Sequence, residues 1–362
     1  MAKPCNPENK GLPTRWQAVH GAYYFRVPPG LEHLWDGKQK FRLGKTLPEA
    51  YKVWAERTAA PTTASTVDQL LDQFAIEEIP NREPATRSSY TMAMTGLRKA
   101  FGPMQMAEVR PKHIYQYVKA RSVKRTSPEG KVTGGVTVSH REIEVLSAAF
   151  TAAVKWGYLD RHPFKGEVRL VGEKPRDRYV EDWEVVECLA LPVMRKKGSV
   201  LAIQAYIRIK LLTGLRGGDL LRLRPADIQE DGLHVTPHKT ANTTAKKVIY
   251  TWTDELRAAV AMALAARPVQ IAPWVFCTGK GVGYMNEATG KASGWKSMWQ
   301  RFFARVLAET KVTEHFTEHD LRAKCASDAG TLQHAQALLA HADAATTDRI
   351  YRRKAELVSP LR

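Results

Sequence analysis

Residues 318–322 read EHDLR and place His319 three positions before Arg322, within a run of helical spacing. Side chains three positions apart share one face of a helix, so both would point to the same side. Two other stretches hold polar residues that a plain helical core does not need: TGLRGGDLLRL at 213–223 and LLAHADAATTDRIYRR at 338–353. The first contains two consecutive glycines, each of which costs a helix about 1 kcal/mol relative to alanine. This cost indicates that the backbone and the preceding guanidinium approach another group closely.

The composition is that of a globular and strongly basic protein. The 362 residues hold 55 Lys+Arg against 37 Asp+Glu, a net charge of +18 at pH 7. An apolar share of 44% excludes wholesale disorder. The basic excess is spread along the chain and favours nucleic acid as a partner, because each neutralised phosphate releases condensed counterions. Charge alone also fits a protein that is basic for solubility.

The sequence predicts neither a membrane protein nor a metal-binding protein. No stretch approaches the roughly 18–20 uninterrupted apolar residues of a membrane helix, and residues 1–13 lack the apolar core of a signal peptide. We therefore expect a cytoplasmic protein with no membrane partner. The four cysteines lie far apart without a C-x-x-C pair, which argues against a disulfide framework or a thiolate zinc site. His315 and His319 have the spacing of zinc ligands on a helix, but Thr317 between them resembles a helix cap and no third ligand is evident.

The N-terminal residues 1–60 are expected to form a small α+β unit. Residues 16–27 are rich in aromatic and β-favouring residues, and residues 38–43 alternate polar and apolar side chains, as a strand does. Residues 46–49 (TLPE) form a capping box that opens a short helix. The small residues AAPTTAS that follow mark a domain boundary.

From Thr66 onward the pattern becomes helical. Another capping box, TVDQ at 66–69, begins a run that predicts four helices with short connections over residues 63–165. After a charged connector, residues 176–362 are expected to be mostly helical with one hairpin, formed by 233–236 and 248–252. The predicted fold class is therefore mainly α with small β elements in a multidomain chain.

The polar stretches and the hairpin together resemble the catalytic domain of the tyrosine recombinases, the phage integrase family. Four pieces carry the resemblance in the family's order: T-G-L-R with an acid three residues on, a hairpin lysine in PHKT, H-x-L-R, and L-x-H followed by a tyrosine. Each piece alone is weak, whereas their order and separation over residues 176–362 are specific. Residues 63–165 resemble the family's less distinctive core-binding domain. Residues 1–60, with GAYYF and LGKTLPEA, resemble the arm-binding region of some prophage integrases.

The resemblance implies a role for each matching residue. Arg216 and Arg322 match the two arginines that clamp the scissile phosphate, and Asp219 matches the acid that braces the first of them. His319 and His341 match the two positions that assist catalysis, and Tyr351 matches the nucleophile. Lys239 matches the lysine that protonates the leaving 5′ oxygen, although Lys246 and Lys247 in the same hairpin remain alternatives. Whether Tyr351 acts in its own active site or in a neighbour's is left open by the sequence.

Elementary chemistry supports these roles without a cofactor. Two guanidiniums can donate paired hydrogen bonds to phosphate oxygens and meet the negative charge of the transition state without a metal. A tyrosine hydroxyl, with a pKa near 10, needs a neighbouring base or cation, and a histidine can supply it. A lysine can give up a proton to a leaving group, which an arginine cannot. The energy of the broken bond would stay in a 3′-phosphotyrosyl linkage, and the chain has no G-x-x-x-x-G-K-[ST] nucleotide loop.

The sequence thus predicts a site-specific DNA recombinase for prophage or mobile-element integration and excision, independent of metal and ATP. The resemblance implies a homotetramer on double-stranded attachment sites in a bacterial cell, where it would join the nucleoid, with a host DNA-bending protein and an excision factor as possible partners. Alternatives are a catalytically silent DNA-binding or regulatory protein of the same fold, a Xer-like resolvase, and a type IB topoisomerase. A metal-dependent nuclease would need a carboxylate cluster, and none is evident.

Overall fold

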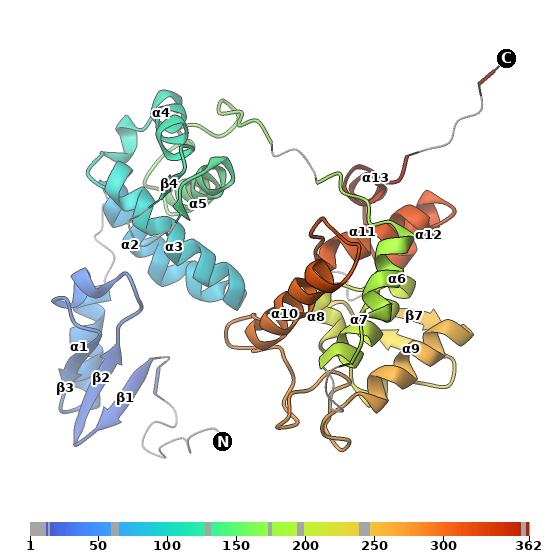
Figure 1. The fold of residues 1–362 in the computed structure, drawn as a ribbon. Helices are drawn as coiled ribbons and strands as arrows, with labels where there is room; N and C mark the ends of the chain where they lie inside the picture. The colour runs from blue at the N-terminus through green and yellow to red at the C-terminus, as the bar shows by residue number, and fades with distance from the viewer. Residues whose placement is uncertain are drawn as a thin grey trace. The chain divides into compact units, whose positions relative to one another are not determined.

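The chain consists of two compact units, residues 1–173 and 174–362, which are described separately (Figure 1). The computed structural model describes residues 12–13, 15–58, 65–126, 132–172, 176–193, 199–238, 247–355 and 360–361. Helices dominate both units and the strands are short, which confirms the predicted fold class. Within the described ranges, no helix has the length and apolar character needed to cross a bilayer.

The first unit begins with a three-stranded antiparallel sheet and a helix. Strands β1 (Trp16–Val19), β2 (Ala22–Arg26) and β3 (Lys40–Gly44) lie in the order β1-β2-β3, followed by α1 (Leu47–Thr58). A two-residue turn joins β1 to β2, with φ of 50° at His20 and 68° at Gly21, the left-handed values that tight hairpins require. One face of the sheet buries Trp35 and Leu43 against α1.

The rest of the first unit is helical, where the sequence predicted helices. It contains α2 (Val67–Glu77), α3 (Pro84–Phe101), α4 (Pro111–Arg121), a short ribbon of β4 (Arg125–Thr126) and β5 (Val132–Thr133), and α5 (Val136–Lys155). The predicted capping box at Thr66 is confirmed, because its hydroxyl accepts from the amide of Gln69 and the Gln69 side chain accepts from the amide of Thr66. Leu70, Leu97 and Phe150 form the centre of its core.

The second unit surrounds a central helix. Its elements are α6 (Asp182–Ala190), α7 (Ser199–Thr213), α8 (Gly217–Leu220), β6 (Gly232–Val235), β7 (Val248–Thr251), α9 (Asp254–Ala265), α10 (Ser293–Glu309), α11 (Glu318–Asp328), α12 (Leu332–Leu338) and α13 (Ala344–Tyr351). Helix α7 packs against α9, α10 and α11. Strands β6 and β7 pair antiparallel, with Gly232 opposite Thr251, so the predicted hairpin is confirmed.

Candidate active site

Helix α11 carries the H-x-L-R motif and is fixed at its first turn. Thr317 is the N-cap residue, and the Asp320 carboxylate accepts from both the amide and the hydroxyl of Thr317, each at 2.8 Å. The prediction that Thr317 caps a helix is therefore confirmed. The cap sets the direction of the turn that bears His319, and Arg322 follows one turn later.

Arg322 is a buried guanidinium held by three acceptors. Its side chain is 1% exposed and donates to the carbonyl of Gly214, to the carbonyl of Leu339 at 2.8 Å, and to Nε2 of His341 at 2.9 Å. Nε of Arg322 is buried as well and has no hydrogen-bond partner in the part of the chain that the structure describes. Three of its five N–H groups are thus engaged, and the N–H of Nε and one N–H of Nη1 remain to bind an anion.

Two glycines allow the backbone to approach this site. Gly214 has a φ of +64°, and a Cβ there would lie 2.7 Å from the side chain of Leu339. Its amide donates to the carbonyl of Lys210, which ends α7 with a left-handed cap. A Cβ on Gly217 would lie 2.9 Å from the hydroxyl of Tyr206. The close approach that the consecutive glycines indicated is thus found at Gly217.

Arg216 lies at the N-cap of α8, close to Arg322. Burial and, second, the positive charge of Arg216 lower the pKa of the Arg322 guanidinium. Asp219, which the family resemblance assigned to brace Arg216, accepts instead from the amide of His238 at 2.8 Å. The carboxylate therefore fixes the end of the hairpin strand that leads to Lys239.

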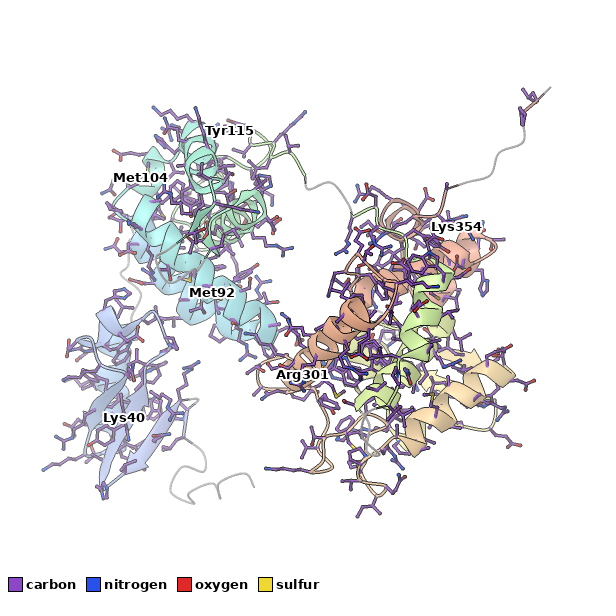
Figure 2. The ribbon with its side chains drawn as sticks, in the orientation of Figure 1. Lys40, Met92, Met104, Tyr115, Arg301 and Lys354 are labelled. Carbon is purple, nitrogen blue, oxygen red and sulfur yellow. The ribbon has the colours of Figure 1, made fainter. Side chains whose placement is uncertain are left out.

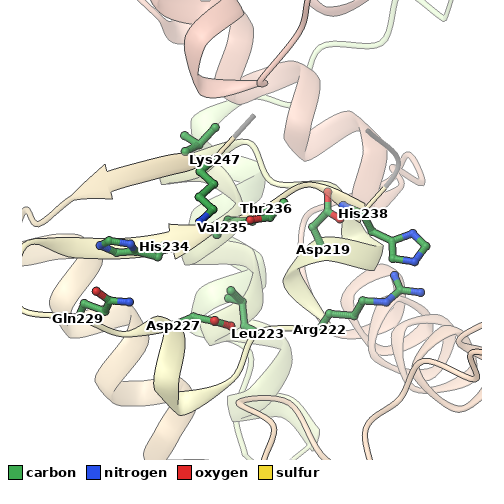
Figure 3. Close-up of a pocket in the computed structure, with 11 residues that line it drawn as sticks. Asp219, Arg222, Leu223, Asp227, Gln229, His234, Val235, Thr236, His238 and Lys247 are labelled. Carbon is green, nitrogen blue, oxygen red and sulfur yellow. Dashed lines mark hydrogen bonds between the residues drawn. The ribbon is translucent and has the colours of Figure 1, made fainter. Parts of the chain in front are cut away.

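The hairpin lysines are only partly described. Lys239 and Lys246 lie outside the described residues, which stop at His238 and resume at Lys247. Lys247 is exposed and lines a groove together with Asp219, Arg222, His234 and His238 (Figure 3). The choice among the three lysines stays a prediction.

Tyr351 is the last residue of α13 and is packed among the other candidate residues. It is 8% exposed, and its ring centroid lies 5.2 Å from that of His319 and 4.9 Å from that of His341. Cζ of Arg322 lies 5.3 Å from the centre of the Tyr351 ring. Side chains from α11, α13 and the loop between α12 and α13 thus meet in one site. Its centre is formed by His319, Arg322, His341 and Tyr351.

The hydrogen bonds of His341 fix its tautomer. An arginine can only donate, so Nε2 of His341 must accept the 2.9 Å bond from Arg322 and carries no proton. Nδ1 therefore holds the proton and donates to the hydroxyl of Thr347 at 2.9 Å. Thr347 is fully buried in α13. This contact makes Thr347 a positioning residue that the sequence analysis did not identify.

Replacing Thr347 by valine should slow DNA cleavage about tenfold or more, because a misoriented imidazole disturbs the site around Tyr351. Leaving the Nδ1 proton of His341 without an acceptor should also lower the free energy of unfolding by about 1–3 kcal/mol. Single-turnover cleavage and urea unfolding measure the two effects, and Thr347→Ser should restore both. Wild-type cleavage by the valine variant would contradict the assignment.

His319 is neutral in the folded protein. Burial of part of its ring, followed by the charges of Lys210 and Arg322, lowers the pKa of His319 to about 4. Near neutral pH the ring therefore accepts a proton only when negative charge arrives to offset the surrounding cations.

A buried cluster behind Gly217 was also missed by the sequence analysis. Lys210 is 1% exposed and donates to the carbonyl of Leu215 at 3.0 Å, and burial lowers its pKa to about 8. Tyr206, one turn earlier in α7, donates to the Glu318 carboxylate next to His319. A lysine inside the apolar run of α7 was the available signal, because lysines are rarely fully buried without a partner.

The described residues contain no group of three or more His, Cys, Asp or Glu side chains that could hold a metal ion. His315, considered above as a zinc ligand, has its ring 4.3 Å from that of Phe303 and lies in the loop before α11.

A family model matches the part of the chain that holds this site. The model described as the phage integrase family matches residues 191–357, a range that includes every candidate site residue. No curated protein matches the chain in sequence.

Solved structures with a similar fold are integrases. A lambda integrase dimer bound to a COC′ core site matches with a TM-score of 0.59 and 17% identity, over 97% of this chain and 99% of that chain. A lambda integrase tetramer bound to a Holliday junction matches with a TM-score of 0.56 and 17% identity, over 92% and 97%. The Tn1549 transposon integrase in complex with circular intermediate DNA matches with a TM-score of 0.59 and 16% identity, over 82% and 97%. The family model and the fold agree on the C-terminal part of the chain, where residues 191–357 match the phage integrase family, the tyrosine recombinases.

Proposed function

We propose that this protein is a site-specific DNA recombinase that cuts and rejoins DNA through a 3′-phosphotyrosyl intermediate. The observation that carries the proposal is the packing of Tyr351 against Arg322, with both histidine rings within about 5 Å of its own. A tyrosine that only anchored the chain end would need neither a buried arginine nor two imidazoles around it.

The two arginines would hold the scissile phosphate. Arg322 has a buried Nε without a partner among the described residues, and Arg216 lies nearby and is partly exposed. Guanidiniums fixed before the reaction stabilise negative charge that develops on phosphate oxygens. The Tyr351 oxygen would then form a bond to phosphorus as the bond to the 5′ oxygen breaks.

Proton transfer would divide between a histidine and a hairpin lysine. Both ring nitrogens of His341 are engaged, by Arg322 and by Thr347, whereas His319 is neutral. We therefore assign the Tyr351 proton to His319, whose pKa a bound phosphate would raise. Lys239, as the family resemblance implies, would give its proton to the leaving 5′ oxygen, which leaves a free 5′-hydroxyl. The reverse steps rejoin the strand, so the reaction needs neither ATP nor a metal ion.

The N-terminal sheet would bind a second class of DNA site. One of its faces exposes Arg26, Lys40 and Arg42, with Lys40 4.6 Å above the ring of Tyr24; Figure 2 shows Lys40 on this part of the chain. A sheet face of cations and aromatic rings suits a phosphate backbone and its adjoining groove. We propose residues 1–60 as an arm-type DNA-binding domain, followed by a core-binding domain at 63–165 and a catalytic domain at 176–362.

This organisation favours integration and excision of a prophage or mobile element over a Xer-like resolvase, which usually lacks such an N-terminal unit. Lambda integrase, which has a similar fold, has been solved as a dimer on a core site and as a tetramer on a Holliday junction. We propose that this chain also acts as a tetramer on attachment-type DNA, with a host DNA-bending protein and an excision factor as partners.

The deciding experiment offers the protein a nicked duplex that spans the ends of the element carrying its gene. We expect an SDS-resistant adduct whose nucleotide maps by mass spectrometry to the peptide containing Tyr351, formed equally with and without EDTA. An adduct on another residue, or one that a chelator abolishes, would overturn the mechanism. Salt-dependent DNA binding without any adduct would favour the catalytically silent alternative.

A further inference from the structure

The backbone on both sides of Tyr351 is held by side chains from outside its helix turn. The hydroxyl of Ser327, on α11, donates to the carbonyl of Tyr351 at 2.9 Å and accepts from the amide of Arg353 at 2.7 Å. Nε of Arg353 turns back and donates to the carbonyl of Ile350 at 3.1 Å. Both carbonyls that flank the Tyr351 side chain are therefore fixed.

The guanidinium of Arg353 also enters a buried ion pair. Its Nη1 lies 2.6 Å from Oδ1 of Asp320, with side-chain exposures of 5% and 1%. Oδ2 of the same carboxylate caps α11 at Thr317 and lies 3.2 Å from Arg176. Removing one partner of a buried pair is costly because the other charge stays behind in a medium of low dielectric. The carboxylate that fixes the helix of His319 and Arg322 thus also holds the chain just beyond Tyr351.

We propose that Ser327, Asp320 and Arg353, together the C-terminal anchor, position Tyr351 against Arg322, His319 and His341. The proposal rests on the proposed function, in which Tyr351 is the nucleophile. The anchor fixes the backbone at Tyr351 to the helix that bears His319 and Arg322, so it sets where the phenol lies relative to these two side chains.

Two variants test the positioning role on the same nicked duplex. Ser327→Ala removes both backbone hydrogen bonds. Arg353→Ala removes the ion pair and the guanidinium's hydrogen bonds to the carbonyls of Ile350 and Arg178. We expect each to slow adduct formation about tenfold to a hundredfold, since small misplacements of a reacting group have effects of this size, with DNA affinity unchanged at fixed salt. Arg353→Lys should recover part of the rate. Arg349→Ala, which removes an exposed arginine from α13, is the matched control and should cleave like the wild type.

The stability and DNA affinity of the anchor variants separate a positioning role from a purely structural one. If Ser327→Ala unfolds at the wild-type temperature, binds DNA normally and cleaves within twofold of the wild type, the anchor does not position Tyr351. Should Arg353→Ala fail to fold, Ser327→Ala decides alone, because it exchanges one small side chain for another. The wild-type adduct separates the two proposals: its absence defeats the function, whereas its presence beside fully active anchor variants defeats only this inference.

Discussion

Tyr351→Phe is expected to abolish the covalent protein–DNA adduct and to leave DNA binding unchanged. Phenylalanine keeps the ring that packs against His319, His341 and Arg322 and removes only the oxygen that would attack phosphorus. Loss of a covalent nucleophile costs an enzyme about 10³-fold or more. Binding depends on phosphate contacts by cations, which the substitution does not touch.

The measurement compares SDS-resistant adduct and filter-binding affinity for wild-type and variant proteins on one nicked duplex. Tyr284→Phe is the matched control, because Tyr284 lies in the same unit and its hydroxyl has only a weak contact, 3.7 Å from the sulfur of Met298. Equal adduct from Tyr351→Phe and wild type would remove the nucleophile assignment. Equal loss in both tyrosine variants would show that the effect is not specific to the site.

Local patterns predicted the elements and the order of the motifs. The caps at Thr66 and Thr317 each depend on side chains three positions apart, so the sequence contains all the partners. The hairpin strands could be predicted as well, since a run of β-favouring residues is visible without the partner strand. The resemblance to the tyrosine recombinases then assigned catalytic roles to Arg322, His341 and Tyr351, and the fold brings these three residues together.

Contacts between distant segments could not be predicted in this way. Asp219 was assigned to Arg216, three residues away, yet its carboxylate binds the amide of His238, 19 positions later. Ser327 and Arg353 lie 26 positions apart and have no sequence feature that distinguishes them from a surface serine and arginine. Buried polar groups take the partners that tertiary packing places beside them, because leaving them unpaired is costly. The exception is Lys210, whose place in an apolar helix was visible in the sequence.

Arg322→Lys is expected to reduce cleavage about 10²–10³-fold, although it keeps the positive charge, because a fixed donor to the reacting oxygens is lost. Lysine presents a point charge on a flexible stem, whereas the guanidinium is a planar fork. That fork now binds the carbonyls of Gly214 and Leu339 and the imidazole of His341 at once. An ammonium group cannot reproduce this geometry and also present an N–H to a phosphate.

The same substitution should lower the free energy of unfolding, by about 1–3 kcal/mol for each buried acceptor that loses its donor. Arg216→Lys is the informative comparison, because Arg216 is partly exposed and no described acceptor depends on it. Arg216→Lys should lose cleavage activity with little change in the free energy of unfolding. Urea unfolding and single-turnover cleavage of both variants separate the two contributions. If Arg322→Lys cleaved within tenfold of the wild type, the guanidinium would serve to hold α11 against Gly214 and Leu339, and the phosphate would have to be bound by Arg216 and the hairpin lysines instead.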